Sequence, residues 1–210
     1  MVSLLGAEFW REERRKWRIA GTPRAHIGQL RDGQPVSIRG IVRGLGRPVV
    51  AAITGRTGVF VKYWLQAEFP VAEPHVLKEG IELRSFEIVE DGKAVVVEAS
   101  CIVDFWSQPE HLAKVHARRL TTEQKRVLDA ANVENPWPVD IITDFVFAEA
   151  VVADGDEVQI LGRAAIEIHP QGDRESLRDQ PIRRALHGTK AEPVVLMRVS
   201  DASELGSTIR

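Results

Sequence analysis

The sequence predicts a mainly β protein (β-rich α+β), an antiparallel OB-like barrel or sandwich with a helical insertion and a short N-terminal helix. Apolar and polar residues alternate along several runs, as they do in half-buried strands. Asp-Gly pairs, which favour tight turns, precede or separate these runs. A helix-capping pattern appears where the alternation stops. We therefore expect a basic helix over residues 1–21 and a single domain over residues 22–205 with a helical insertion at 107–136.

The N-terminal helix is the only segment whose charge suggests a partner. Residues 1–47 carry ten Lys or Arg against four Asp or Glu, so their net charge of +6 leaves −8 for the rest of a chain of net charge −2. A basic helix with tryptophans could lie on an anionic lipid surface. Alternatively, the tryptophans pack on the domain and the charges are solvated. The candidate surface residues are Trp10, Arg11, Arg14, Arg15, Lys16, Trp17 and Arg18.

The strands begin after Asp32-Gly33. Val36, Ile38 and Val42 alternate with Ser37, Arg39 and Arg43, which predicts a half-buried strand. Two further segments are rich in β-branched and aromatic residues and are set off by turn signals at Thr54-Gly55 and Asp91-Gly92. These predicted strands cover residues 59–69 and 94–105.

The predicted helical insertion follows. Residues 109–132 lack the alternation, and Thr121 with Gln124 has the form of a capping box that begins a helix. The segment Asn135-Pro136-Trp137-Pro138 ends the insertion, because neither proline can donate a backbone hydrogen bond.

The chain then returns to strands, at residues 140–152 and in a long strand whose apolar face includes Val158, Ile160, Ala164, Ile166 and Ile168. The start of this strand repeats the start of the first one. Asp32 to Gly40 and Asp154 to Gly162 both read Asp-Gly, two residues, Val-x-Ile-x-Gly. This repetition indicates either two barrel-like halves or one common strand pattern used twice. In both copies the final glycine is expected to permit a bulge or a bend.

Four segments in order resemble the GIDE-type domain, also called the BAM domain, which is known from membrane-anchored RING-type ubiquitin ligases and from many bacterial proteins. They are "DGQPVSIRGIV", "AITGRTGVFVKYWLQ", "FVFAEAVVADGDEVQILGRA" and "LRDQPIRRALHGTKAEPVVLMRVS". The resemblance implies a β-rich module that senses or scaffolds, without catalytic residues of its own. The motif residues to which it assigns a structural role are Gly40, Gly55, Arg56, Gly155, Gly162, Arg178 and Pro181.

The resemblance has limits. The segment "TGRTG" (residues 54–58) lacks the cysteine expected there, and the chain has neither flanking membrane helices nor a cysteine-rich RING, so ligase activity is not implied. In the last motif we expect Leu177, Ile182 and Leu186 to face inward.

No pattern of an enzyme is found, and we expect neither a catalytic site nor a cofactor nor a metal. His111 and His116 are five residues apart, which does not place them on one helical face, and no serine lies in a GxSxG context. Cys101, the single cysteine, is expected to pack inside an apolar strand. The acidic residues Glu149, Asp154, Asp156 and Glu157 could bind a hard cation or could simply be solvated beside a turn.

Two classes of function follow. The first is a non-catalytic interaction or scaffolding module with an unidentified protein partner, peripheral to a membrane through weak contacts of the N-terminal helix. The second is an OB-like protein that binds single-stranded nucleic acid, which the net charge of −8 beyond residue 47 disfavours. Since the sequence lacks a membrane-spanning apolar run and a signal peptide, we expect a cytoplasmic protein. The nucleic-acid face would consist of Arg39, Arg43, Arg47, Arg56, Lys62, Tyr63 and Trp64.

Overall fold

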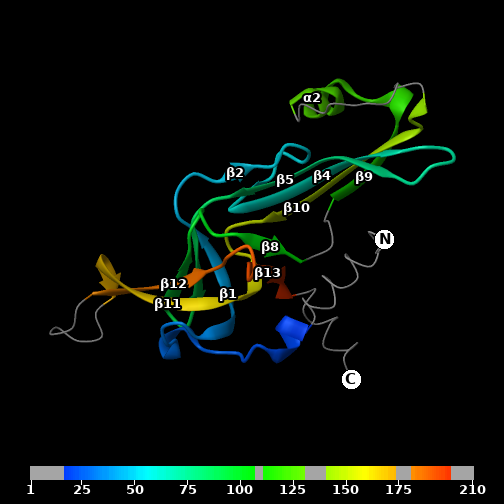
Figure 1. The fold of residues 1–210 in the computed structure, drawn as a ribbon. Helices are drawn as coiled ribbons and strands as arrows, with labels where there is room; N and C mark the ends of the chain where they lie inside the picture. The colour runs from blue at the N-terminus through cyan, green and yellow to red at the C-terminus, as the bar shows by residue number, and fades with distance from the viewer. Residues whose placement is uncertain (1–16, 107–110, 131–140, 174–180, 200–210) are drawn as a thin grey trace. The chain divides into compact units, whose positions relative to one another are not determined.

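The computed structural model describes residues 17–106, 111–130, 141–173 and 181–199 (Figure 1). The Cα positions separate into two compact units, each built from separate stretches of chain. The first unit takes its described residues from Met1–Arg43, Phe86–Trp106 and Glu157–Arg210, and the second from Gly44–Ser85 and Ser107–Asp156. Neither unit is one continuous segment. The single domain expected over residues 22–205 stays a prediction, for which the cooperativity of unfolding is the test.

The first unit is a closed barrel of five strands. Its strands are β1 (Pro35–Gly44), β6 (Phe86–Glu90), β7 (Lys93–Val97), β12 (Ile182–His187) and β11 (Glu157–Asp173), in that order around the barrel, and β1 pairs with β11 to close it. The predicted mainly β fold with a barrel is therefore confirmed.

The sequence analysis expected an antiparallel arrangement, but two strand pairs are parallel. β12 runs parallel to β7, and β13 (Val194–Arg198), which extends the sheet beyond β11, runs parallel to β8 (Val103–Phe105). Parallel pairs join segments far apart in sequence, a feature that local alternation does not reveal.

The alternation of apolar residues does place the barrel core. Val36, Ile38, Val42, Val158 and Ile160 are almost completely buried, whereas Ile168, at the end of the long predicted face, is 72% exposed. The other strands of the barrel contribute further buried side chains to this core. The largest of these, each less than 2% exposed, are Phe86, Ile88 and Leu186.

The two copies of the Val-x-Ile-x-Gly motif are neighbouring strands of one barrel. β1, blue in Figure 1, and β11, yellow, pair antiparallel with Val36 opposite Gly162 and Gly40 opposite Val158. The interpretation as two barrel-like halves is therefore wrong. The register runs without interruption from Pro35 to Ile41, so the bulge expected at the glycines is absent from this pairing. The preceding Asp-Gly pairs do form turns, with φ of +73° at Gly33 and +87° at Gly155.

The second unit is a four-stranded antiparallel sheet. Its order is β5 (His75–Leu83), β4 (Phe60–Glu68), β10 (Asp144–Val152) and β9 (His111–His116), beside a short pair of β2 (Val49–Val50) and β3 (Thr57–Gly58). One face of the sheet carries the core of the unit. The buried members of this core are Leu65, Ala67, Ala117, Ile142, Phe145 and Phe147, with Val127 and Leu128 of helix α2 packed against them.

The expected helical insertion at 107–136 is only partly helical. Helix α2 (Thr122–Ala130) is confirmed, and its capping box is formed, since Thr121 N donates to Gln124 Oε1 at 2.9 Å and Gln124 N to Thr121 Oγ1 at 3.2 Å. The described residues before it form strand β9 and a 3-10 turn, η2 (Ala117–Arg119). The strand forms because β10 offers it a hydrogen-bonded edge and because Ala113 and Val115 reach the core.

Two other segments also differ from the prediction. The predicted strand over residues 94–105 is interrupted between β7 and β8 by a turn, in which Cys101 N donates to Glu98 O at 3.0 Å. Cys101 thus lies in a turn and not inside a strand.

Strand β5, which the sequence analysis did not identify, carries charged residues at positions 78, 79 and 82 that obscure its alternation. Among the described residues, no helix is long and apolar enough to cross a membrane.

Candidate functional site

The described end of the N-terminal helix is attached to the first unit. Trp17 is 75% exposed, so it does not pack on the domain, contrary to the second of the two alternatives for this helix. Arg18 donates to Pro193 O at 3.1 Å, and Ile19 packs against the buried cluster of Leu161, Val195 and Met197. The other predicted surface residues, Trp10, Arg11, Arg14, Arg15 and Lys16, lie outside the described part of the chain.

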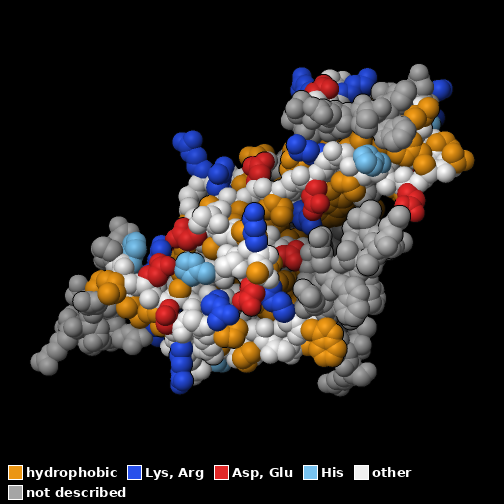
Figure 2. Space-filling model, in the orientation of Figure 1, with side chains coloured by type: hydrophobic (Ala, Val, Ile, Leu, Met, Phe, Trp, Pro, Cys, Tyr) orange, Lys and Arg blue, Asp and Glu red, His pale blue; other side chains and the backbone are white. Residues whose placement is uncertain are grey.

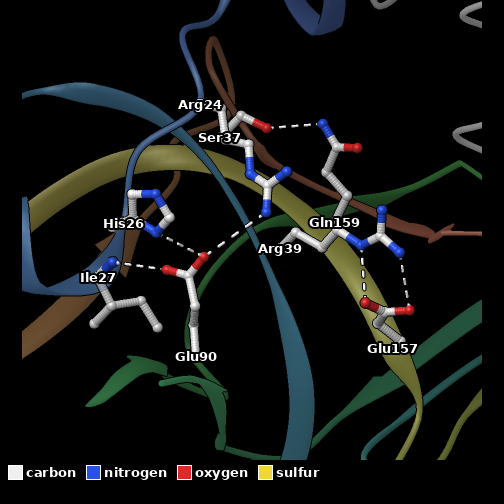
Figure 3. A network of polar contacts seen from close by, with 8 residues as sticks. All are labelled: Arg24, His26, Ile27, Ser37, Arg39, Glu90, Glu157 and Gln159. Atoms are coloured by element: carbon white, nitrogen blue, oxygen red, sulfur yellow. Dashed lines mark hydrogen bonds and ion pairs between the residues drawn. The ribbon is translucent and has the colours of Figure 1, made fainter. Parts of the chain in front are cut away.

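Glu90 on β6 holds the segment that precedes the barrel (Figure 3). Its carboxylate accepts from Ile27 N at 3.0 Å, lies 3.1 Å from His26 Nδ1 and 3.8 Å from Arg24 Nη2, and its side chain is only 11% exposed. These contacts fix residues 24–27 against β6. This part of the network is therefore structural.

The other contacts drawn in the same figure join β1 to β11. Arg39 Nε and Nη2 donate to the two oxygens of Glu157 at 2.8 and 3.1 Å, and Gln159 Nε2 donates to Ser37 Oγ at 2.8 Å (Figure 3). The hydrogen bond with Glu157 raises the pKa of Arg39, and the same bond lowers the pKa of Glu157. Arg43 is likewise bonded to Glu87. Two arginines of the proposed nucleic-acid face are thus neutralised by carboxylates.

A second ionic cluster joins β11 and β12. Arg183 donates to Glu167 at 2.6 Å and pairs with Glu98 at 2.9 Å, while His187 Nε2 lies 3.1 Å from Glu167. The hydrogen bond from Arg183, reinforced by His187, lowers the pKa of Glu167. This cluster connects β11 and β12 to Glu98, the residue that follows β7.

The residues of the "TGR" motif form a loop that closes over a buried carboxylate. Glu149 on β10 is 1% exposed and accepts hydrogen bonds from Ile53 N, Thr54 N and Thr54 Oγ1 at 3.1, 3.1 and 2.6 Å. Gly55, with φ of +70°, makes the turn, and Arg56 O accepts from Ala51 N at 2.8 Å. Gly55 and the backbone of Arg56 therefore shape this loop, while the role that the resemblance assigns to them stays a prediction.

The acidic residues proposed for a cation do not converge. Besides Glu149 and Glu157, Asp154 accepts from Gly44 N at 2.7 Å and Asp156 from Ala153 N at 2.8 Å. Each carboxylate supports its own local turn or pair. Among the residues that the structure describes, no three His, Cys, Asp or Glu side chains are grouped to hold a metal ion.

The residues considered for catalysis are also separated. His111 and His116 are the first and last residues of strand β9, five residues apart. Cys101 Sγ donates to Leu186 O at 3.3 Å, and burial raises the pKa of its thiol, which disfavours the reactive thiolate.

The C-terminal motif is partly described. Leu186 is completely buried as expected, Ile182 is half-buried, and Pro181 O accepts from His169 N at 3.0 Å. Leu177 and Arg178 lie outside the described residues.

A further surface, of which the sequence analysis named only Lys62 and Trp64, lies on the four-stranded sheet, on the face opposite its core. Trp64 is opposite Ala148 on β10, which is opposite Leu112 on β9, so the three side chains share this face. On β5, Ile81 is opposite Lys62 and Val76 is opposite Gln66, two residues to either side of Trp64. We call these positions the Trp64 face: Trp64, Val76, Ile81, Leu112, Val146 and Ala148, with the charged residues that surround them.

The apolar part of the Trp64 face is exposed at its edges and flanked by paired charges. Leu112 is 64% exposed, Val76 49% and Ile81 46%. Lys62 Nζ lies 5.4 Å from the centroid of the Trp64 ring and 3.1 Å from Glu79, and Lys114 pairs with Glu68 and Asp144. The alternation of Lys62, Trp64 and Gln66 in the sequence is the signal that could have predicted this face.

No family model, no curated protein and no solved structure matches this chain. The resemblance to the GIDE-type domain stays a prediction.

Proposed function

We propose that this chain is a non-catalytic binding module that docks a protein partner on the Trp64 face. The observation that carries the proposal is the composition of this face, which combines a tryptophan and exposed aliphatic residues with a rim of ion pairs. Protein interfaces have such a pattern, because aromatic residues are enriched in them and their charged residues gather at the rim.

The charge of the face favours a protein over a polyanion. Lys62 and Lys114 are both ion-paired, and the carboxylates of Glu68, Glu79 and Asp144 outnumber them. Binding of nucleic acid depends on cations that replace the counterions of the phosphates. Basic and acidic side chains also intermingle over the side of the molecule shown in Figure 2. Single-stranded nucleic acid therefore remains the weaker alternative.

The order of the strands supports an OB-like assignment of the barrel. Numbered along the chain, the five barrel strands lie in the order 1-2-3-5-4, and strand 3 runs parallel to strand 5. In OB-folds the loop between the first two strands contributes to ligand binding. Here the corresponding segment, between β1 and β6, contains β4 and therefore Trp64. The proposed scaffolding role, with a cytoplasmic location, also agrees with what the GIDE-type resemblance implies.

Site-directed crosslinking in cells would test the proposal. A photo-reactive amino acid replaces Leu112 in one variant and Val50 in the control, because both side chains are 64% exposed in the second unit and only Leu112 lies on the Trp64 face. We expect a protein adduct at position 112 that is absent at position 50. The partner identified in the adduct is then purified on its own, and the Kd of its complex with this protein is measured by calorimetry.

The Kd measurement decides the outcome. Leu112→Glu and Ile81→Glu should weaken binding about tenfold or more, whereas Val50→Glu should leave it unchanged. Equal weakening by Val50→Glu would contradict the proposal. An adduct formed only with a second copy of this chain would indicate self-association in place of a protein partner. An adduct formed only with nucleic acid would favour the nucleic-acid alternative.

A further inference from the structure

A pocket of about 370 Å³ lies within the second unit, apart from the sheet face described above. A volume of this size suits a small ligand. Its walls come from the end of β1 and the loop after it, from β3 and the residue that follows it, from the two residues between β5 and β6, and from the turn after β10. The lining residues are Gly44, Leu45, Gly46, Arg47, Pro48, Thr57, Gly58, Val59, Arg84, Ser85, Ala153 and Asp154.

Two arginines line this pocket and give it positive charge. Neither Arg47 nor Arg84 forms an ion pair with another residue of the described part of the chain, whereas Arg39, Arg43, Arg163 and Arg183 all do. Two guanidinium groups that line one pocket repel each other unless an anion lies between them. Guanidinium groups bind phosphate and carboxylate oxygens in preference to other partners.

The loop adds hydrogen-bond donors. The backbone N–H groups of Gly46 and Arg47 have no hydrogen-bond acceptor among the described residues, and Gly46 has a φ of +120°. Gly44 N and Leu45 N are already bonded, to Asp154 Oδ1 at 2.7 Å and to Ser85 O at 3.2 Å, which fixes the loop. Leu45, Pro48 and Val59 provide an apolar wall beside these donors.

We propose that this pocket binds a small soluble phosphate monoester. Arg47 and Arg84 hold the phosphate, the N–H groups of the loop share its oxygens, and the apolar wall receives the organic part. Asp154 is the one acidic residue of the lining, so the three charged side chains sum to +1. The assignment concerns a site separate from the proposed protein interface and does not depend on it.

Titration of the intact protein with phenyl phosphate and with inorganic phosphate, at constant ionic strength, tests the proposal. Calorimetry gives the Kd, and the amide signals of Gly46 and Arg47 report the location by NMR. We expect phenyl phosphate to bind more tightly than inorganic phosphate. Arg47→Gln and Arg84→Gln should each weaken binding about tenfold or more.

Two further variants separate a site from general charge effects. Arg118→Gln removes an exposed arginine of the same unit outside the pocket, and binding should not change. Asp154→Asn keeps an oxygen that can accept from Gly44 N but removes the negative charge, so binding should strengthen about twofold or more.

Two results would overturn the assignment. One is an equal loss of affinity in Arg118→Gln and Arg84→Gln, which would indicate binding to net charge alone. The other is the absence of any change in the amide chemical shifts of Gly46 and Arg47 when phenyl phosphate or inorganic phosphate is added to millimolar concentration. If the pocket variants reduce pelleting with phosphatidylserine vesicles but leave binding of both soluble phosphates unchanged, the site is for a lipid headgroup and the soluble ligand is excluded.

Discussion

The two glycines that end the repeated motif should respond oppositely to replacement by alanine. Gly40 and Gly162 occupy the same motif position on paired strands of one barrel, and neither has a positive φ. A Cβ atom added to Gly40 would lie 2.5 Å from Val89 O and 2.7 Å from Ile88 Cγ2. One added to Gly162 would have Leu186 Cβ as its nearest neighbour, at 3.4 Å.

These distances set the expected free energies. At Gly40 the first contact is the backbone of β6, which cannot move without disturbing the barrel, and overpacking of this kind costs about 1–3 kcal/mol or more. The reduced entropy of the unfolded chain offsets about 0.4–1 kcal/mol of this. We therefore expect Gly40→Ala to destabilise the protein by roughly 1–2 kcal/mol. Gly162→Ala should be neutral or stabilising by up to about 1 kcal/mol, because its methyl group meets ordinary van der Waals contacts.

Urea denaturation followed by far-ultraviolet circular dichroism would measure both variants against the parent protein. A loss of 1–2 kcal/mol lowers Tm by about 2–8 °C in a protein of this size. Because both glycines lie in the first unit, the comparison does not depend on how the second unit unfolds. Equal destabilisation by the two variants, or a larger effect at Gly162, would refute the assignment of Gly40 to the close approach between β1 and β6.

Four further outcomes are expected. Glu149→Ala should cost about 1–3 kcal/mol and expose the amides of Ile53 and Thr54 to hydrogen exchange, because their buried acceptor is lost; unchanged protection would contradict the role of Glu149. The lowered pKa of Glu167 means that its ionised form stabilises the fold above the ordinary glutamate pKa of about 4.3, and that this contribution is lost as the pH falls through the lowered value. Glu167→Gln should therefore reduce stability at pH 7 and flatten the acid decline below the ordinary glutamate pKa of about 4.3, with Glu192→Gln as the control; parallel acid curves would argue against it. A fragment of residues 22–106 should show no cooperative thermal transition, since β1 and β4 lose their partners β11 and β10, and dispersed amide resonances in that fragment would oppose the single-domain prediction. Removal of residues 1–20 should reduce the weak, salt-sensitive pelleting of the protein with phosphatidylserine vesicles, and equal pelleting would exclude a membrane role for the helix.

The sequence alone was sufficient for the features that depend on near neighbours in the chain. Alternation placed Val36, Ile38, Val158 and Ile160 in the barrel core, because successive side chains of a strand point to opposite faces. The Asp-Gly turns and the capping box of α2 were also predicted, since their hydrogen bonds or φ values involve only a few consecutive residues.

Charged residues limited what local patterns could reveal. Strands β5 and β9 were missed because edge strands carry charged and exposed side chains, and only their pairing with β4 and β10 identifies them. For the same reason the sequence did not predict the Trp64 face, whose members come from four strands that are not consecutive in the chain.

Tertiary structure also decided what each charged or repeated residue does. The composition of the acidic group 149–157 allowed a cation site, but Glu149 closes a loop, Asp154 binds a backbone N–H, and Glu157 neutralises Arg39. Gly40 and Gly162 are identical in the motif, yet a Cβ atom would lie 2.5 Å from the backbone of the neighbouring strand at Gly40 and 3.5 Å from it at Gly162. Local sequence determines the conformation of a segment, whereas the partner of a side chain is set by residues that may be 100 or more positions away, as between Arg39 and Glu157, and that only the closed barrel brings within hydrogen-bonding distance.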